Sequence, residues 1–78
     1  MTLYELGEEI KKLRRQKTIT QEALCNIAGI SRPTLSRLEN GEFANVSVRS
    51  LDKILNALGY EISITPSNPF RLPVLEDE

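Results

Sequence analysis

Residues 20–41, TQEALCNIAGISRPTLSRLENG, decide the fold of this 78-residue chain. The Thr20 hydroxyl can accept a hydrogen bond from the free N–H groups that begin a helix, and Gly29 can take the left-handed conformation that often ends one. Ser31 is a second N-cap, and Pro33 stands in a first turn, where its missing N–H costs nothing. The stretch therefore predicts two short helices joined by a tight turn. Apolar residues expected to face the core recur at helical spacing in both: Ala23, Leu24, Ile27, Leu35 and Leu38.

This stretch resembles the helix-turn-helix of the Xre family, the phage-repressor-like DNA-binding domains. The resemblance rests on Gln21 at the start of the first helix, the small residue Cys25, the turn at Gly29 and Ile30, and the closing LSRLENG of residues 35–41. It implies an all-α domain of four to five helices that binds double-stranded DNA. An unrelated helical bundle that carries a similar hairpin is the alternative.

Amphipathic helices are expected on both sides of the hairpin. Leu3, Leu6, Ile10 and Leu13 recur at helical spacing and predict an N-terminal helix that starts at Leu3 or Leu6, with Thr2 as a cap, and ends near Gln16. Residues 47–58 predict a final helix, ended by Gly59, that packs on the first two helices. Its apolar stripe is Val48, Leu51, Ile54, Leu55 and Leu58.

A single strand is expected after the last helix. Apolar Tyr60, Ile62 and Ile64 alternate with polar residues, which is typical of a strand with one apolar face. Such a strand has no partner within a helical domain, so we expect it to pair with its copy across a twofold axis. The predicted fold is therefore all-α with one added strand that pairs in a homodimer.

Length and composition indicate one domain at residues 1–66, with the dimerising strand at about 60–65, and a flexible tail at 67–78. The chain has one cysteine and no histidine, which argues against an intramolecular disulfide and the usual zinc clusters. We expect no metal, no cofactor and no catalytic residue, since nothing resembles a phosphate loop or a paired-acid site. No signal sequence or apolar run of about 20 residues is present, which predicts a cytoplasmic protein that binds no membrane.

The net charge of −1 hides an uneven distribution. Residues 1–58 carry nine Lys and Arg against seven Asp and Glu, whereas residues 59–78 carry one against four. The helical part is therefore weakly basic, which is compatible with a weak-to-moderate DNA binder whose acidic tail faces elsewhere.

The second helix of the hairpin, the recognition helix, carries the expected base contacts. If it enters the major groove, its N-terminal residues and its next exposed turn face base edges. Arginine suits guanine O6 and N7, while proline offers only van der Waals contact, which leaves more of the specificity to the arginines and to DNA shape. A generic phosphate contact or solvated surface is the alternative for each arginine. The predicted base-reading residues are Arg32, Pro33, Thr34, Ser36 and Arg37.

Three further residues are predicted to contact the DNA backbone. The Gln21 amide can reach a phosphate from a helix N-terminus, whose N–H groups point the same way, and Ser31 can do so while it caps. The resemblance adds Arg49, at the start of the last helix. It also implies an ion pair between Arg14 and Glu39, and losing one partner of a buried pair costs about 3–5 kcal/mol.

Four helices followed by a dimerising strand resemble, over about residues 5–65, the antitoxins of the HipA/HipB kind. The resemblance implies a homodimeric repressor that binds a palindromic operator, regulates its own operon and neutralises a HipA-like serine/threonine kinase toxin. A stand-alone phage-type or restriction-modification controller without a toxin partner is the alternative. The tail could hold the partner or remain solvated, and its apolar residues are Phe70, Leu72, Val74 and Leu75.

Overall fold

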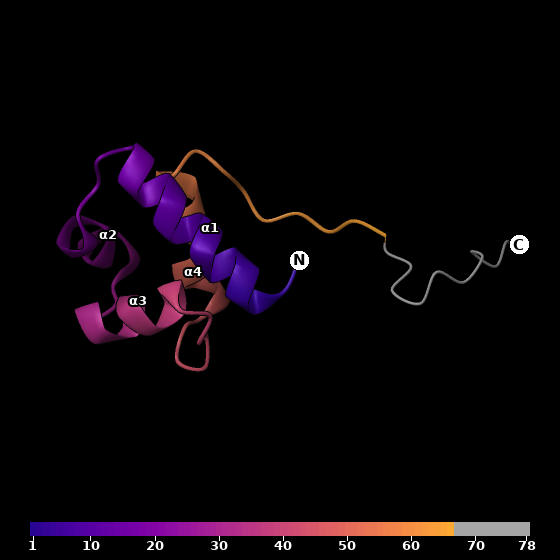
Figure 1. Ribbon diagram of the computed structural model, residues 1–78, viewed down its shortest axis with the longest axis horizontal. Coiled ribbons are helices and arrows are strands. Elements are labelled where there is room, and N and C mark those ends of the chain that lie inside the picture. The colour runs from indigo at the N-terminus through magenta and orange to yellow at the C-terminus, as the bar shows by residue number, and fades with distance from the viewer. Residues whose placement is uncertain (67–78) are drawn as a thin grey trace, which may run out of the picture.

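The computed structural model describes residues 1–66, which form four helices (Figure 1). Their bounds are α1 Leu3–Gln16, α2 Gln21–Ala28, α3 Arg32–Glu39 and α4 Val48–Ala57. The prediction of an all-α helix-turn-helix domain is confirmed, with helix bounds close to those expected.

Each of these helices begins at a hydroxyl side chain. The oxygen accepts a hydrogen bond from the N–H three residues further on, at 3.0–3.3 Å. At the start of α1 the Glu5 carboxylate also accepts the Thr2 N–H at 2.8 Å, which completes a capping box. One such cap is worth about 1 kcal/mol, so local chemistry defines where each helix starts. The four N-caps are Thr2, Thr20, Ser31 and Ser47.

The ends of the helices share one hydrogen-bond pattern, in which an N–H just beyond the helix donates to the carbonyl oxygen five residues earlier. The Ile19 N–H, for example, donates to the Arg14 carbonyl at 3.0 Å. This turn needs a left-handed residue, and three helices supply glycine, with φ of 71°, 93° and 88° at Gly29, Gly41 and Gly59. At the end of α1 the position is Thr18, with φ 57°. A β-branched residue is costly in this conformation, so the turn after α1 is strained.

The core lies between two pairs of helices, because α1 packs mainly on α3 and α4 packs mainly on α2. Cys25 and Ala28 join it from the second helix. Burying aliphatic side chains is the main favourable term in folding, at about 1.5–3 kcal/mol each. The fully buried large side chains are Ile10, Leu24, Leu35, Leu38, Ile54 and Leu58.

Several predicted core positions are wrong. Ile27 is 47% exposed and Ala23 is exposed, because the buried face of α2 is centred on Leu24, Cys25 and Ala28. Leu3 and Val48 are 58% and 74% exposed. Each is the first residue of its helix and lies before the point where that helix meets its neighbour.

The backbones of α1 and α3 come into direct contact at two glycines. A Cβ added to Gly7 would overlap the Leu38 carbonyl oxygen and lie 2.9 Å from the Gly41 nitrogen. A Cβ on Gly41 would lie 2.8 Å from the Tyr4 Cα. Real Cβ atoms do not come this close to backbone, so this helix crossing requires glycine.

Residues 60–66 form no strand in the structure of the single chain, so the strand of the predicted fold class is not confirmed. They leave α4 as an extended segment (Figure 1), and Tyr60, Ile62 and Ile64 are 54%, 43% and 94% exposed. A strand needs a neighbouring backbone to bond with, and pairing with a second copy stays a prediction. None of the helices in residues 1–66 has the length and apolar character needed to cross a bilayer. The predicted partner-binding residues of the tail, Phe70, Leu72, Val74 and Leu75, lie outside the described residues.

Candidate nucleic-acid interface

A buried ion pair joins α1 to the end of α3. Arg14 and Glu39 are only 8% and 4% exposed. The Arg14 Nε donates to Glu39 Oε2 at 2.6 Å and Nη2 donates to Oε1 at 3.3 Å, while Nη1 donates to the Ile19 carbonyl at 3.0 Å. Two parallel charge-assisted bonds hold one geometry strongly. The pair that the resemblance implied is therefore present, and it also holds the connection between α1 and α2.

Gln21 extends this polar network to the exposed surface. Its Nε2 donates to Glu39 Oε1 at 3.1 Å and to Ser36 Oγ at 3.4 Å, so its amide protons are directed into the protein. Its Oε1 accepts from Arg32 Nη2 at 3.5 Å. Because a phosphate oxygen only accepts hydrogen bonds, this amide would have to leave these partners to bind one. In the free chain Gln21 instead links the start of α2 to α3 along its length, from Arg32 to Glu39.

The five predicted base-reading residues lie on α3, but they differ in how they face the solvent. Arg32, Pro33 and Arg37 are exposed, whereas Thr34 and Ser36 are half-buried. Leu35, Leu38 and Glu39 occupy the opposite, buried face. The recognition helix thus presents two guanidinium groups outward, with the hydroxyls set back between them and the core.

The three predicted backbone contacts lie at the starts of three different helices. Ser31 caps α3 and shares a 2.9 Å hydroxyl hydrogen bond with Thr34, beside the start of the recognition helix. Gln21 reaches the same end of α3 through Arg32. Arg49 is exposed in the first turn of α4 and makes no ion pair within residues 1–66. Its contact with the DNA backbone stays a prediction.

Cys25 is a packing residue of the α2–α3 hairpin. Its side chain is 5% exposed, and burial raises the pKa of the thiol while nearby Arg32 and Arg14 act in the opposite direction. A neutral, enclosed thiol is a poor nucleophile. Cys25 is therefore a small buried side chain of the core.

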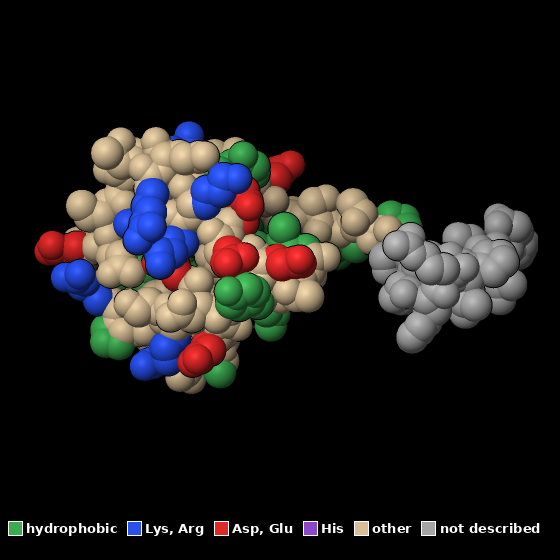
Figure 2. All heavy atoms as spheres, viewed as in Figure 1, with side chains coloured by type: hydrophobic (Ala, Val, Ile, Leu, Met, Phe, Trp, Pro, Cys, Tyr) green, Lys and Arg blue, Asp and Glu red, His purple; other side chains and the backbone are tan. Residues whose placement is uncertain are grey.

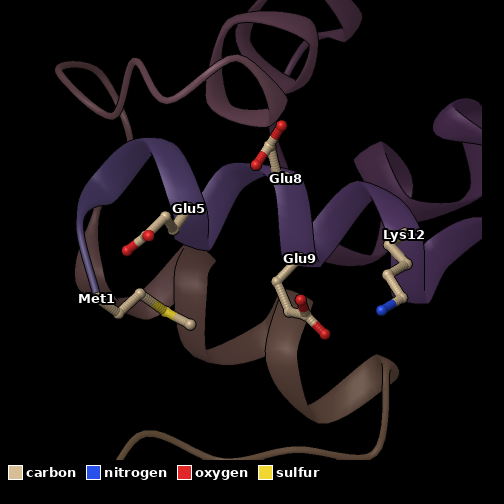
Figure 3. Close-up of a pocket in the computed structure, with 5 residues that line it drawn as sticks. All are labelled: Met1, Glu5, Glu8, Glu9 and Lys12. Atoms are coloured by element: carbon tan, nitrogen blue, oxygen red, sulfur yellow. The ribbon is translucent and has the colours of Figure 1, made fainter.

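The N-terminal half of α1 forms an acidic surface around a shallow hollow (Figure 3). Glu8 and Glu9 point to opposite sides of the helix, so they do not form a convergent pair of carboxylates. The acidic end of this surface, with Glu5 and Glu9, is unfavourable for a phosphate backbone. The residues around the hollow are Met1, Glu5, Glu8, Glu9 and Lys12.

Two structural residues were not found by the sequence analysis. Gly7 lies inside an otherwise helical pattern, and an isolated glycine there often marks close packing, so a signal was present. Ser50 donates its hydroxyl to the Ala28 carbonyl at 3.0 Å and so ties α4 to the end of α2. No local pattern indicates this bond, because its partner lies in another helix.

Two consecutive helices, a left-handed glycine turn and an outward-facing second helix define a helix-turn-helix domain. The family described as helix-turn-helix matches residues 10–64. The chain belongs to this family, and the Xre-type assignment is confirmed.

Its relatives include regulators and antitoxins. The control protein C.MunI of a Mycoplasma species is 40% identical over 58 residues, which are 73% of this chain and 77% of that protein. The antitoxin PezA of Streptococcus pneumoniae is 45% identical over 49 residues, 63% of this chain and 30% of PezA. A chain in the solved structure of the HipA-HipB-O2-O3 complex is 26% identical with a TM-score of 0.70, covering 87% of this chain and 94% of its own. The chain spans from 30% to 77% of the length of the curated relatives it matches.

Proposed function

We propose that this chain is a sequence-specific DNA-binding transcriptional repressor and the antitoxin of a HipA/HipB-like module. The observation that carries the DNA-binding part is the recognition helix α3, whose Arg32 and Arg37 face outward from a helix anchored by the core and by Glu39. An anchored helix presents its guanidinium groups to guanine O6 and N7 without a large ordering cost.

The antitoxin part rests on similarity. PezA is named an antitoxin, and the chain of the HipA-HipB-O2-O3 complex matches nearly the whole of this domain in shape. We propose a toxin partner of the serine/threonine kinase class, bound outside the recognition helix so that DNA and partner can be held together.

We also propose that the protein acts as a homodimer on a palindromic operator. Three apolar side chains, Tyr60, Ile62 and Ile64, are exposed on one short segment beyond α4, and a second copy would cover them. Analytical ultracentrifugation of Ile62→Lys tests this, because a charge on the paired face should give a monomer. Ser63→Lys, which places the same charge on the other face of the segment, is the matched control. A monomeric wild type, or dimers in both variants, would contradict the proposal.

A stand-alone controller remains the second candidate. C.MunI, a control protein, is 40% identical and this chain covers 77% of it, whereas it covers only 30% of PezA. The two candidates share DNA binding and differ only in whether a protein partner exists.

DNA binding is tested by selecting duplexes from a random pool with the wild-type chain and measuring the enriched site by fluorescence anisotropy. We expect Arg37→Ala to weaken the enriched site selectively, since a good bidentate base contact is worth about 1–3 kcal/mol of discrimination. Lys53→Ala, which removes a basic side chain from α4, is the matched control. No enrichment, or binding that does not weaken between 50 and 200 mM salt, would refute DNA binding.

The partner is tested by recovering the tagged chain from its native host, beside a version that ends at Pro66. Recovery of a kinase-like protein encoded next to this chain, and its loss on truncation, would support the antitoxin role and assign the tail. Recovery of promoter DNA without any protein would favour the stand-alone controller.

A further inference from the structure

A shallow groove runs between α1 and the C-terminal end of α3, and its walls are mostly basic and polar. From α1 it is lined by Lys11, Lys12 and Arg15, and from the end of α3 by Asn40. Figure 2 shows basic side chains gathered on the face where α1 passes α3. None of the predicted DNA contacts includes these residues.

The groove is positively charged because its carboxylates are too few to neutralise its three basic side chains. Glu39 borders it, but this side chain is already paired with Arg14. Glu8 is then the remaining acid in the groove, against three cations. Within residues 1–66 none of the three cations forms an ion pair. In the part of the chain that the structure describes, no carboxylate neutralises their charge, so the groove can attract an anion.

The position of the groove relative to the recognition helix identifies the anion. A recognition helix lies in the major groove with its N-terminal residues at the base edges, and phosphate strands border that groove on both sides. The cationic groove beside the C-terminal end of α3 therefore lies near a phosphate strand when α3 is in the major groove. Ser31 stands at the N-terminal end of α3, while Asn40 follows its C-terminal end and lines the cationic groove.

We propose that Lys11 and Arg15, with the Asn40 amide, bind the phosphate backbone of DNA beside the C-terminal end of α3. These contacts would add to the predicted backbone contact of Ser31 at the other end of the recognition helix. Since phosphate contacts carry no sequence information, this groove raises affinity for all duplexes and not only for the operator. The inference rests on the proposed DNA binding.

The test measures binding of the wild type, Lys11→Ala, Arg15→Ala and the double variant to the selected duplex and to a scrambled duplex of equal length. Each lost phosphate contact should lower the slope of log K against log salt by about 0.9 per protomer. Affinity for the two duplexes should fall by the same factor, so their ratio stays constant. Lys53→Ala is the matched control and should change neither quantity.

A variant that makes the groove more positive separates an effect of charge from an effect of unfolding, because unfolding cannot increase affinity. Glu8→Gln removes the remaining acid and should increase affinity for both duplexes, while circular dichroism confirms that each variant keeps its helices. Variants with the slope of Lys53→Ala would overturn the inference but leave the proposed function intact, and so would a change confined to the selected duplex. A wild type that binds neither duplex would overturn both.

Discussion

The two helix pairs of this domain are held together by different means. Where α1 crosses α3, the backbones touch at Gly7, and the Arg14–Glu39 pair closes the end of the contact. Where α2 meets α4, aliphatic side chains such as Leu24 and Ile54 fill the space. The first contact adds a close backbone approach and a buried charge pair to its apolar packing, whereas the second depends mainly on buried apolar volume.

This difference determines how each contact responds to change. Backbone that is already in contact cannot accept an added atom, and a buried charge cannot lose its partner cheaply. A packed aliphatic interface loses free energy in proportion to the volume removed. We therefore expect abrupt effects at the α1–α3 contact and graded effects at the α2–α4 contact.

The largest effect is expected from Gly7→Ala. The new methyl group would overlap the Leu38 carbonyl oxygen, and no side-chain rotation can relieve a clash that involves only Cβ and backbone. A domain of this size has only about 3–5 kcal/mol of stability, so we expect loss of the folded state in urea titrations followed by circular dichroism. Gly29→Ala is the control: its Cβ meets open space, and only the left-handed conformation should cost about 1–2 kcal/mol. If both substitutions lowered the free energy of unfolding equally, the close approach of Gly7 to the Leu38 carbonyl would be contradicted.

The next largest effect is expected from breaking the ion pair. Glu39→Ala or Arg14→Ala should each lower the free energy of unfolding by about 3–5 kcal/mol, because each leaves an unpaired buried charge.

Replacing both partners separates the cost of an unpaired charge from the value of the pair. The double variant Arg14→Met with Glu39→Leu should recover much of the loss, as buried pairs replaced by apolar residues often do. Losses that add up from the single variants Arg14→Met and Glu39→Leu, which complete this double-mutant cycle, would argue that the two side chains act independently.

The α2–α4 contact should respond in small steps. Ile54→Val removes one buried methylene and should cost about 0.5–1.5 kcal/mol, while Ile54→Ala should cost about 2–5 kcal/mol. Thermal unfolding of both variants measures these losses. The control is Lys53→Ala at an exposed position, whose free energy of unfolding should lie within about 0.5 kcal/mol of the wild-type value. An Ile54→Val variant as unstable as Ile54→Ala would show that this contact also depends on shape.

The smallest effect is expected at the turn after α1, and it is a gain. Thr18 has φ 57°, where the other helix ends use glycine. Thr18→Gly should raise the free energy of unfolding by up to about 1 kcal/mol, because the relief of strain exceeds the added entropy of the unfolded chain. Thr18→Ala keeps a Cβ in the left-handed region and should gain less, which urea titrations can resolve. A destabilised Thr18→Gly would show that the threonine side chain has another role.

The helix-turn-helix motif predicts most residues of the candidate interface, but it does not predict the contacts that each of them makes. Arg32 and Arg37 face outward on α3, where helical spacing puts them. The direction of the Gln21 amide could not be predicted, because it depends on Glu39 and Ser36, both 15 or more residues away in sequence. The cationic groove likewise joins residues of α1 to Asn40 across a helix crossing.

The sequence by itself determined where the helices begin and end. Thr2, Thr20, Ser31 and Ser47 cap N–H groups three residues away, and the turns that end the helices close within five residues, so neighbouring residues contain all the information. Only the tertiary structure decided which apolar residues are buried, why Gly7 admits no side chain and where Gln21 points. These depend on how far one helix lies from another, and that distance is set by the packing of the whole core.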